Sequence, residues 1–508
     1  MTTHDFMTPL ARLSSGVPGL DKVLGGGFFA GGVYILEGAP GAGKTILANQ
    51  IAFHHAKQGR RIVYITLLAE SHTRLLQHLQ DLTFFDPATI PDQLTYVSGF
   101  RTLEEAGLRG LLDMLRKELR SVSASIVILD GFAAVAESAE SEREFKKFVH
   151  ELQVQAGLAP CTFFLLSSGL SPTPESVLPV HTMVDGLVRL SDHLTGVRSQ
   201  RALRVAKLRG SGYLRGLHSL DISAEGVHVY PRLESRAQEV TDGGGIERVS
   251  SGHARFDAML GGGLIRGSTM MLLGPTGVGK TILGYQYVSA STSVDKGLLF
   301  SFYETPQRAV SKADGIGLNL ARARERGDLD VMWQSPVEGS LDAIAERLLG
   351  AVDSTGARRL FIDGFEGFQY AAAYPERVPQ FFAALQGALH RRGVTTLYTS
   401  ELRQIFSPAI KAPVRGLSPL LENLVLLRFV ELRGEVHRVI SVLKMRDSGF
   451  DPTIRKFEVN EHGVEIHDDF RTLEGVLTGV AHPVRPARRA RPRAKVKPTG
   501  GKPKRRRG

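Results

Sequence analysis

GAPGAGKT, at residues Gly38–Thr45, recurs as GPTGVGKT at Gly274–Thr281, and these two stretches decide the fold that the sequence predicts. Each follows a short apolar run and precedes a run of helix-forming residues, which is the strand, loop and helix context of a phosphate-binding loop. Glycines let backbone N–H groups approach phosphate oxygens, while a lysine reaches the outer phosphates and a threonine hydroxyl reaches Mg²⁺. The sequence therefore predicts two ATP sites.

The residues expected to bind ATP and Mg²⁺ are the same in both copies. They are Gly38, Gly41, Gly43, Lys44 and Thr45 in the first loop, and Gly274, Gly277, Gly279, Lys280 and Thr281 in the second. Asp130 and Asp363 each end an apolar run, ILD and FID, where a carboxylate would hold Mg²⁺ directly or through water. We therefore predict that Thr45 and Asp130 form one metal site, and that Thr281 and Asp363 form the other.

The surrounding sequence repeats as well, so whole domains are duplicated. LSSGVPGLDKVLGGG begins at residue 13 and VSSGHARFDAMLGGG begins 236 positions later. In each copy short apolar runs alternate with helix-length stretches, which predicts a mostly parallel sheet with helices on both faces. We expect one domain at residues 1–236, a polar, Gly-rich linker at 237–245 and a second domain at 246–470.

The excess of basic residues is confined to the end of the chain. Of 63 Lys and Arg residues, 12 lie at 481–508, which leaves 51 basic residues against 52 acidic ones elsewhere. Residues 471–508 are therefore expected to form a disordered basic tail. This tail either contacts polyanions such as nucleic acids without specificity or only keeps the protein soluble.

The composition also indicates the cellular compartment in which the protein is expected. Cys161 is the single cysteine, so no internal disulfide can form and a Cys-based metal site is not expected. No apolar stretch approaches the roughly 20 residues that span a bilayer, and the N-terminus lacks the apolar core of a signal peptide. We expect a cytoplasmic protein with no membrane contact.

Hydrolysis also needs a group that activates the attacking water. Glu70, in YITLLAES, and Glu304, in LLFSFYETP, follow the strand after each loop's helix and are the candidates. The alternative is that they are solvated loop carboxylates. The strand ends Ser167-Ser168 and Thr399-Ser400 offer hydroxyls for the γ-phosphate.

A Lys-x-Arg pair is repeated late in both copies, as Lys207 with Arg209 and as Lys444 with Arg446. If subunits form a ring, such a pair can reach a neighbour's γ-phosphate and neutralise charge in the transition state, as an arginine finger does. The alternative is a charged strand edge that faces solvent.

In these motifs the chain resembles the KaiC family, tandem RecA-like ATPases related to the circadian clock ATPase. The resemblance runs from about residue 13 to about residue 470, and includes both loops, the aspartate-ending strands and the segments KLRGSGYLRGLHSLDISAEGVHVYPRL and KMRDSGFDPTIRKFEVNEHGVEI. It implies two RecA-like domains, ATP at subunit interfaces, a homohexameric double ring, slow hydrolysis and regulatory protein partners. In clock members the second domain also phosphorylates itself.

The chain departs from the clock pattern in two places. Clock members carry adjacent catalytic glutamates, whereas here the second domain has Tyr303-Glu304 and the first has a lone Glu70, displaced by one position. Clock members also phosphorylate an adjacent Ser-Thr pair, whereas here Ser418 is followed by Pro419. Ser418 is therefore either a weak phosphosite or an ordinary turn serine, and a two-site cycle is not expected.

Three functions remain open at this level. The first is an ATP-driven oligomeric regulator of the KaiC type. The second is a DNA-dependent motor or recombinase, against which stand the near-neutral body and the lack of the Cys₄ zinc element of the related RadA repair ATPases. The third is a scaffold that assembles on ATP but barely hydrolyses it.

Overall fold

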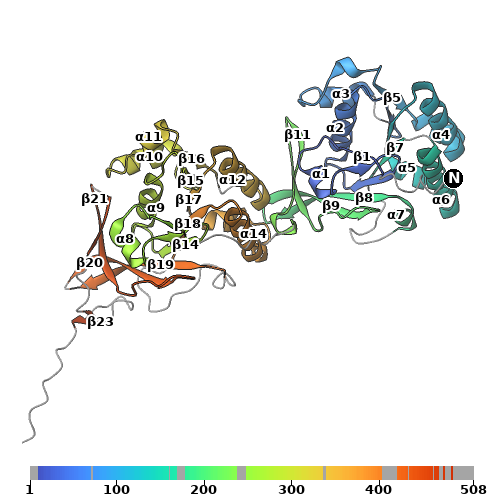
Figure 1. Cartoon of the computed structure of the whole chain (residues 1–508). Helices are drawn as coiled ribbons and strands as arrows, with labels where there is room; N and C mark the ends of the chain where they lie inside the picture. Colours follow the sequence, from blue (N-terminus) through green and yellow to red (C-terminus); the bar gives the residue numbers. More distant parts are fainter. Residues whose placement is uncertain are drawn as a thin grey trace, which may run out of the picture.

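The computed structural model contains two similar bodies, one after the other along the chain (Figure 1). It describes residues 10–69, 72–158, 161–168, 178–236, 247–335, 339–402, 420–432, 434–461, 463–467, 473–474 and 482–483. Glu70, Ser418 and the expected linker lie outside these residues, as does nearly all of the expected basic tail.

The first body is built on a nine-stranded sheet in the order β11-β10-β9-β8-β3-β7-β6-β4-β5. Neighbouring strands from β8 to β5 run parallel, and β9, β10 and β11 extend the sheet in antiparallel fashion. The strands are β3 (Val33–Gly38), β4 (Ile62–Thr66), β5 (Leu94–Ser98), β6 (Ile126–Asp130), β7 (Thr162–Ser167), β8 (Gly186–Thr195), β9 (Arg198–Leu208), β10 (His218–Ser223) and β11 (Gly226–Tyr230).

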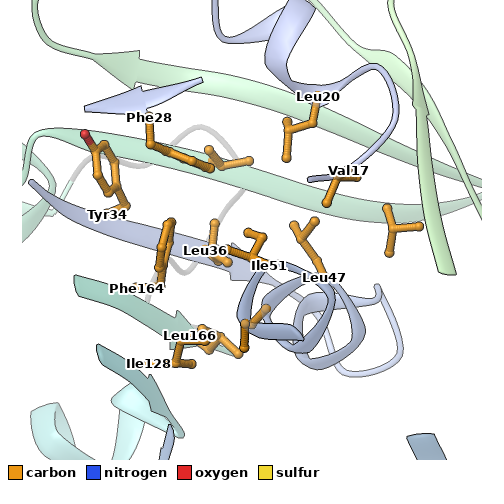
Figure 2. Close-up of a cluster of buried hydrophobic side chains, with 14 of the residues drawn as sticks. Val17, Leu20, Phe28, Tyr34, Leu36, Leu47, Ile51, Ile128, Phe164 and Leu166 are labelled. Atoms are coloured by element: carbon orange, nitrogen blue, oxygen red, sulfur yellow. The ribbon is translucent and has the colours of Figure 1, made fainter. Parts of the chain in front are cut away.

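Helices cover both faces of this sheet because its strands are apolar on both sides. Along β3, Tyr34 and Leu36 point into one core cluster and Val33 and Ile35 into another. Figure 2 shows the first cluster, where Leu47 and Ile51 of the helix after the first loop pack near Leu36. The helices are α1 (Leu20–Val23), α2 (Lys44–Ala56), α3 (His72–Leu79), α4 (Phe100–Val122), α5 (Phe132–Glu137), α6 (Glu142–Leu158) and α7 (Pro179–Met183), and a small pair joins β1 (Arg12–Leu13) to β2 (Phe28–Phe29).

The second body repeats this plan in a nine-stranded sheet of order β16-β15-β17-β18-β14-β19-β20-β21-β22. Its strands are β14 (Thr269–Gly274), β15 (Gly297–Ser301), β16 (Leu329–Trp333), β17 (Arg359–Asp363), β18 (Thr395–Glu401), β19 (Asn423–Leu432), β20 (Glu435–Lys444), β21 (Arg455–Asn460) and β22 (Gly463–His467). Its helices are α8 (Ala254–Met259), α9 (Lys280–Ser289), α10 (Pro306–Asp314), α11 (Leu320–Glu325), α12 (Leu341–Thr355), α13 (Glu366–Ala371) and α14 (Val378–His390). Short pairs join β12 (Arg248–Val249) to β13 (Leu264–Ile265) and β23 (Leu473–Glu474) to β24 (His482–Pro483). The predicted fold class, two mostly parallel sheets flanked by helices, is confirmed.

A polar and apolar contact, which we call the domain seam, joins the two bodies. Leu233 packs in a core cluster of the second body, and its neighbour Glu234 accepts two hydrogen bonds from Arg377, at 2.9 and 2.8 Å. Arg377 also donates to Asp342, at 3.2 and 2.9 Å, and Asp342 accepts bonds from the Leu233 N–H and the Ser219 hydroxyl. In Figure 1 the second body turns α12 and α14 toward the first.

Among the residues that the structure describes, no helix has the length and apolar character needed to cross a membrane.

Candidate functional site

Both predicted loops lie between a parallel strand and a helix, as the sequence analysis expected. The first joins β3 to α2 and the second joins β14 to α9. Gly41 and Gly43 have φ of 82° and 99°, a region that favours glycine. A Cβ on Gly43 would lie 2.6 Å from Ile222 Cδ1, and one on Gly279 would lie 2.9 Å from the Phe457 ring. A Cβ on Gly43 or Gly279 would therefore collide with a side chain of the antiparallel part of the sheet, so both positions require glycine.

The first glycine of each loop is fixed by a close backbone contact. A Cβ on Gly38 would lie 2.4 Å from the Leu190 carbonyl oxygen, and one on Gly274 would lie 2.7 Å from the Leu427 carbonyl oxygen. Gly277, with φ of 78°, meets no atom within 4 Å and needs glycine for its backbone angle alone. The six predicted loop glycines thus serve two different steric needs.

The loop lysines are both folded over their own loops. Lys44 Nζ donates to the Gly38 and Ala39 carbonyl oxygens, at 2.7 and 3.0 Å. Lys280 Nζ donates to the corresponding oxygens of Gly274 and Pro275, at 2.7 and 2.8 Å. Burial lowers the pKa of both ammonium groups, and nearby carboxylates partly oppose the shift. A bound triphosphate would supply the charge that these buried ammonium groups need.

The structure brings each predicted metal pair together. Thr45 Oγ1 donates to Asp130 Oδ2 at 3.2 Å, and Thr281 Oγ1 donates to Asp363 Oδ1 at 3.1 Å. Burial raises the pKa of both carboxyl groups, while the hydroxyl hydrogen bonds favour the ionised form. A hydroxyl beside a carboxylate is the set of hard oxygen donors that Mg²⁺ prefers, so the residues present fit this ion.

A second partner holds each of these aspartates, and sequence reasoning missed it. The Tyr64 hydroxyl donates to Asp130 Oδ2 at 2.7 Å, and Thr399 Oγ1 donates to Asp363 Oδ1 at 2.7 Å. Tyr64 and Thr399 both lie within buried strands, where a hydroxyl needs a partner, and that need was the available signal. The two equivalent aspartates are thus held by hydroxyl groups from strands that do not correspond to each other, β4 in the first body and β18 in the second.

Glu304 is engaged on both of its carboxylate oxygens. Tyr285 donates to Oε2 at 2.6 Å and Lys312 donates to Oε1 at 2.7 Å. Burial alone would raise the pKa of Glu304, but the hydrogen bonds from Lys312 and Tyr285 outweigh it, and the pKa is lowered. Both carboxylate oxygens of Glu304 are therefore hydrogen-bonded in this structure, one to a hydroxyl and one to an ammonium group.

The Lys-x-Arg pairs lie away from the loops of their own chain. Lys207 pairs with Leu187 across β8 and β9, whereas the loop begins at Gly38, which pairs with Leu190. The separation is three residues along β8, or about 10 Å, toward the end of the parallel strands that lies away from the loop. Lys207 and Arg209 instead donate to the carbonyl oxygen of Thr182, at 2.8 and 2.6 Å.

The second pair has the same placement. Lys444 pairs with Leu424, three positions before Leu427, whose carbonyl oxygen lies against Gly274. Lys444 Nζ donates to the Leu421 carbonyl oxygen at 2.5 Å, and the Arg446 N–H donates to Asn423 Oδ1 at 3.2 Å. Neither pair therefore joins the loop of its own body.

The fold and the paired loops define a P-loop ATPase with two tandem domains. A family model described as "ATPase: KaiC" matches residues 13–234 and again residues 249–471. The chain therefore belongs to the KaiC ATPase family.

Similar proteins include three that are named circadian clock oscillator protein KaiC. The one from Picosynechococcus sp. is 25% identical over 473 residues, which cover 91% of each chain. The one from Rippkaea orientalis is 24% identical over 487 residues, covering 94% of this chain and 92% of the relative. The one from Synechococcus elongatus is 24% identical over 490 residues, covering 92% of each chain. The similarity thus extends over both domains.

Proposed function

We propose that the protein binds ATP with Mg²⁺ at both loops, hydrolyses it, and assembles through these sites into a homohexameric ring with a regulatory role. The observation that carries the proposal is the separation of each Lys-x-Arg pair from the loop of its own body. The loops and their aspartates supply the phosphate and metal ligands, and the pair comes from a neighbouring subunit. We take residues 1–236 and 246–470 as the two domains of this ring.

The surroundings of Lys207 support a role toward a neighbouring subunit's nucleotide. Lys207 lines an open cavity of about 680 Å³ together with Arg189, Arg204 and Arg215. Several cationic groups around one cavity suit a triphosphate, and arginine in particular suits phosphate geometry. The relatives' name, circadian clock oscillator protein, supports a regulatory role and regulatory protein partners for this chain.

In each site the roles follow from the chemistry of the groups. Backbone N–H groups of the loop and the lysine would bind the phosphates, and the threonine hydroxyl and the aspartate would hold Mg²⁺. The metal would neutralise charge on the outer phosphates. The neighbour's Lys-x-Arg pair would stabilise the charge that develops in the transition state.

The test is light scattering after size-exclusion chromatography, with and without ATP and Mg²⁺, coupled to an ATPase assay. The proposal expects a hexamer and measurable turnover with ATP. A monomer at saturating ATP would contradict it. A hexamer with negligible turnover would favour the scaffold, and turnover stimulated by DNA would favour the DNA motor.

The basic tail is expected to bind polyanions without sequence specificity. Twelve cationic side chains at 481–508 would gain affinity by releasing condensed counterions, so binding should weaken steeply with salt. Deleting residues 481–508 is expected to abolish salt-sensitive retention on heparin and DNA while ATPase activity persists. Retention that survives the deletion would place the basic surface on the folded domains.

Autophosphorylation, if it occurs, is expected to be weak and confined to Ser418. The acceptor hydroxyl must lie in line with a neighbour's γ-phosphate, and a following proline such as Pro419 biases Ser418 toward extended conformations. Peptide mapping after incubation with radiolabelled ATP would place label on Ser418 that disappears in both Ser418→Ala and Lys280→Ala. Absence of label beside measurable turnover would make the protein an ATPase without kinase activity.

A further inference from the structure

Two carboxylates that the proposed function does not use lie at the second loop. Glu366 opens α13, three residues after Asp363, and Glu401 is the last residue of β18. Strand β18 is hydrogen-bonded to β17 on one side and to the loop strand β14 on the other. The carboxyl ends of these parallel strands therefore bring Glu366 and Glu401 to the same edge as the loop.

A chain of hydrogen bonds connects Glu366 to the loop itself. Glu366 Oε1 accepts from the Ser400 hydroxyl at 2.6 Å and from the Glu401 N–H at 2.7 Å. Glu401 Oε1 accepts from Thr276 Oγ1 at 2.5 Å, and Thr276 is the third residue of the loop. Glu366 is thus oriented by two donors, and Glu401 is tied to the loop that would hold the phosphates.

The charges near Lys280 agree with this placement. Lys280, which would bind the outer phosphates, lies within Coulomb range of three carboxylates, those of Glu401, Glu366 and Asp363. Mg²⁺ and Lys280 together would offset the repulsion between these carboxylates and a triphosphate.

The first domain lacks this arrangement and serves as an internal comparison. The strand registers align Glu366 with Ala133 and Glu401 with Ser168, and the loops align Thr276 with Pro40. Ser167 aligns with Ser400, and its buried hydroxyl has no hydrogen-bond partner among the residues described. Three polar side chains thus differ together between the domains, and a serine that the first domain leaves unpaired is used in the second.

We propose that Glu366 is the carboxylate that orients and deprotonates the attacking water in the second site, with Ser400 and Glu401 as positioning residues. This inference rests on the proposed ATP hydrolysis. The alternative base, Glu304, already has both oxygens bonded to Tyr285 and Lys312. Within the part of the chain that the structure describes, Glu366 accepts hydrogen bonds on Oε1 alone, and both donors belong to β18.

The step balances without any further reagent. The water oxygen forms a bond to the γ-phosphorus while its proton passes to the Glu366 carboxylate. The bond between the γ-phosphorus and the β,γ-bridging oxygen breaks, and its electron pair leaves with ADP. Glu366 then releases the proton to solvent and returns to its ionised form.

The test uses full-length protein carrying Asp130→Asn, which weakens the first metal site so that the remaining turnover comes mainly from the second. Adding Glu366→Gln is expected to lower kcat by about 100-fold, because general-base catalysis contributes about 10² to 10⁴. Binding of a fluorescent ATP analogue should change by less than about threefold, because the amide oxygen still accepts from Ser400 and the Glu401 N–H. Glu366→Asp, which retains a carboxylate, should recover part of the rate.

Glu304→Gln in the same background is the comparison, and its loss in kcat should be at least about tenfold smaller. If Glu366→Gln keeps the parent rate, or if Glu304→Gln causes the larger loss, the inference is wrong while the proposed function stands. If the Asp130→Asn parent binds ATP but does not turn over while the wild type does, the second site does not hydrolyse and the inference is likewise wrong. A wild-type protein without turnover would remove the proposed hydrolysis and the inference together.

Discussion

Lys44→Ala is expected to abolish assembly at ATP concentrations that convert the wild-type protein to a hexamer. The substitution removes the ammonium group that lies 2.7 Å from the Gly38 carbonyl oxygen at the base of the first loop. Losing charge-assisted hydrogen bonds of about 1.5 to 3 kcal/mol would weaken ATP binding by about 10- to 150-fold. Because ATP would join neighbouring subunits, the ATP concentration at half-assembly, followed by light scattering, should rise by the same factor.

Lys57→Ala is the matched control, because Lys57 is an exposed lysine at the other end of the same helix, α2. Its removal changes the net charge equally and should leave the assembly curve unchanged. Equal half-assembly concentrations for Lys44→Ala and the wild type would contradict a nucleotide-dependent interface at the first loop. Circular dichroism of both variants would exclude a loss of fold as the cause.

Arg377→Ala is expected to destabilise the folded protein by about 3 to 5 kcal/mol, the usual cost of removing one partner from a buried ion pair. Arg377 neutralises both Glu234 and Asp342, and the Asp342 side chain is completely buried. Without the guanidinium, two carboxylates in the domain seam would lose the cation that donates hydrogen bonds to both of them. The free energy of unfolding from urea titration, monitored by circular dichroism, measures the loss.

Arg392→Ala provides the control for this substitution. Arg392 also donates two hydrogen bonds to one aspartate, Asp353, but 56% of the Asp353 side chain is exposed. An exposed pair of this kind contributes about 0 to 1 kcal/mol. Similar losses for the two variants would mean that the domain seam contributes no more than a surface contact.

The fold could be predicted because its signals are local and occur twice. The two loops identified a strand and a helix on either side, and the apolar runs that end at Asp130 and Asp363 became β6 and β17. Each aspartate lies beside its threonine because parallel strands present their carboxyl ends at one edge of the sheet. The sequence pattern was thus sufficient for the framework of both sites.

The parts of the site that escaped prediction depend on contacts between distant segments. No local pattern indicates that Tyr64 rather than a residue of β7 supports Asp130, because that choice depends on which side chains meet across the sheet. Glu304 and Lys312 are only eight residues apart, but their ion pair depends on how the segment after β15 leads into α10, which no local pattern indicates. Glu366 carried no signal of its own, since the role we propose for it rests on its hydrogen bond with Ser400 near the end of β18.

Lys207 lies toward the opposite end of the parallel strands from its own loop. This placement bears on whether the subunits form a closed ring. A site assembled from a loop and a Lys-x-Arg pair of different subunits joins them head to tail, so two identical surfaces never meet. In an open row of such subunits, the terminal loop always lacks its partner. Only a closed ring completes every site, and each completed site adds favourable binding energy, so ATP itself would select the cyclic form over an open filament.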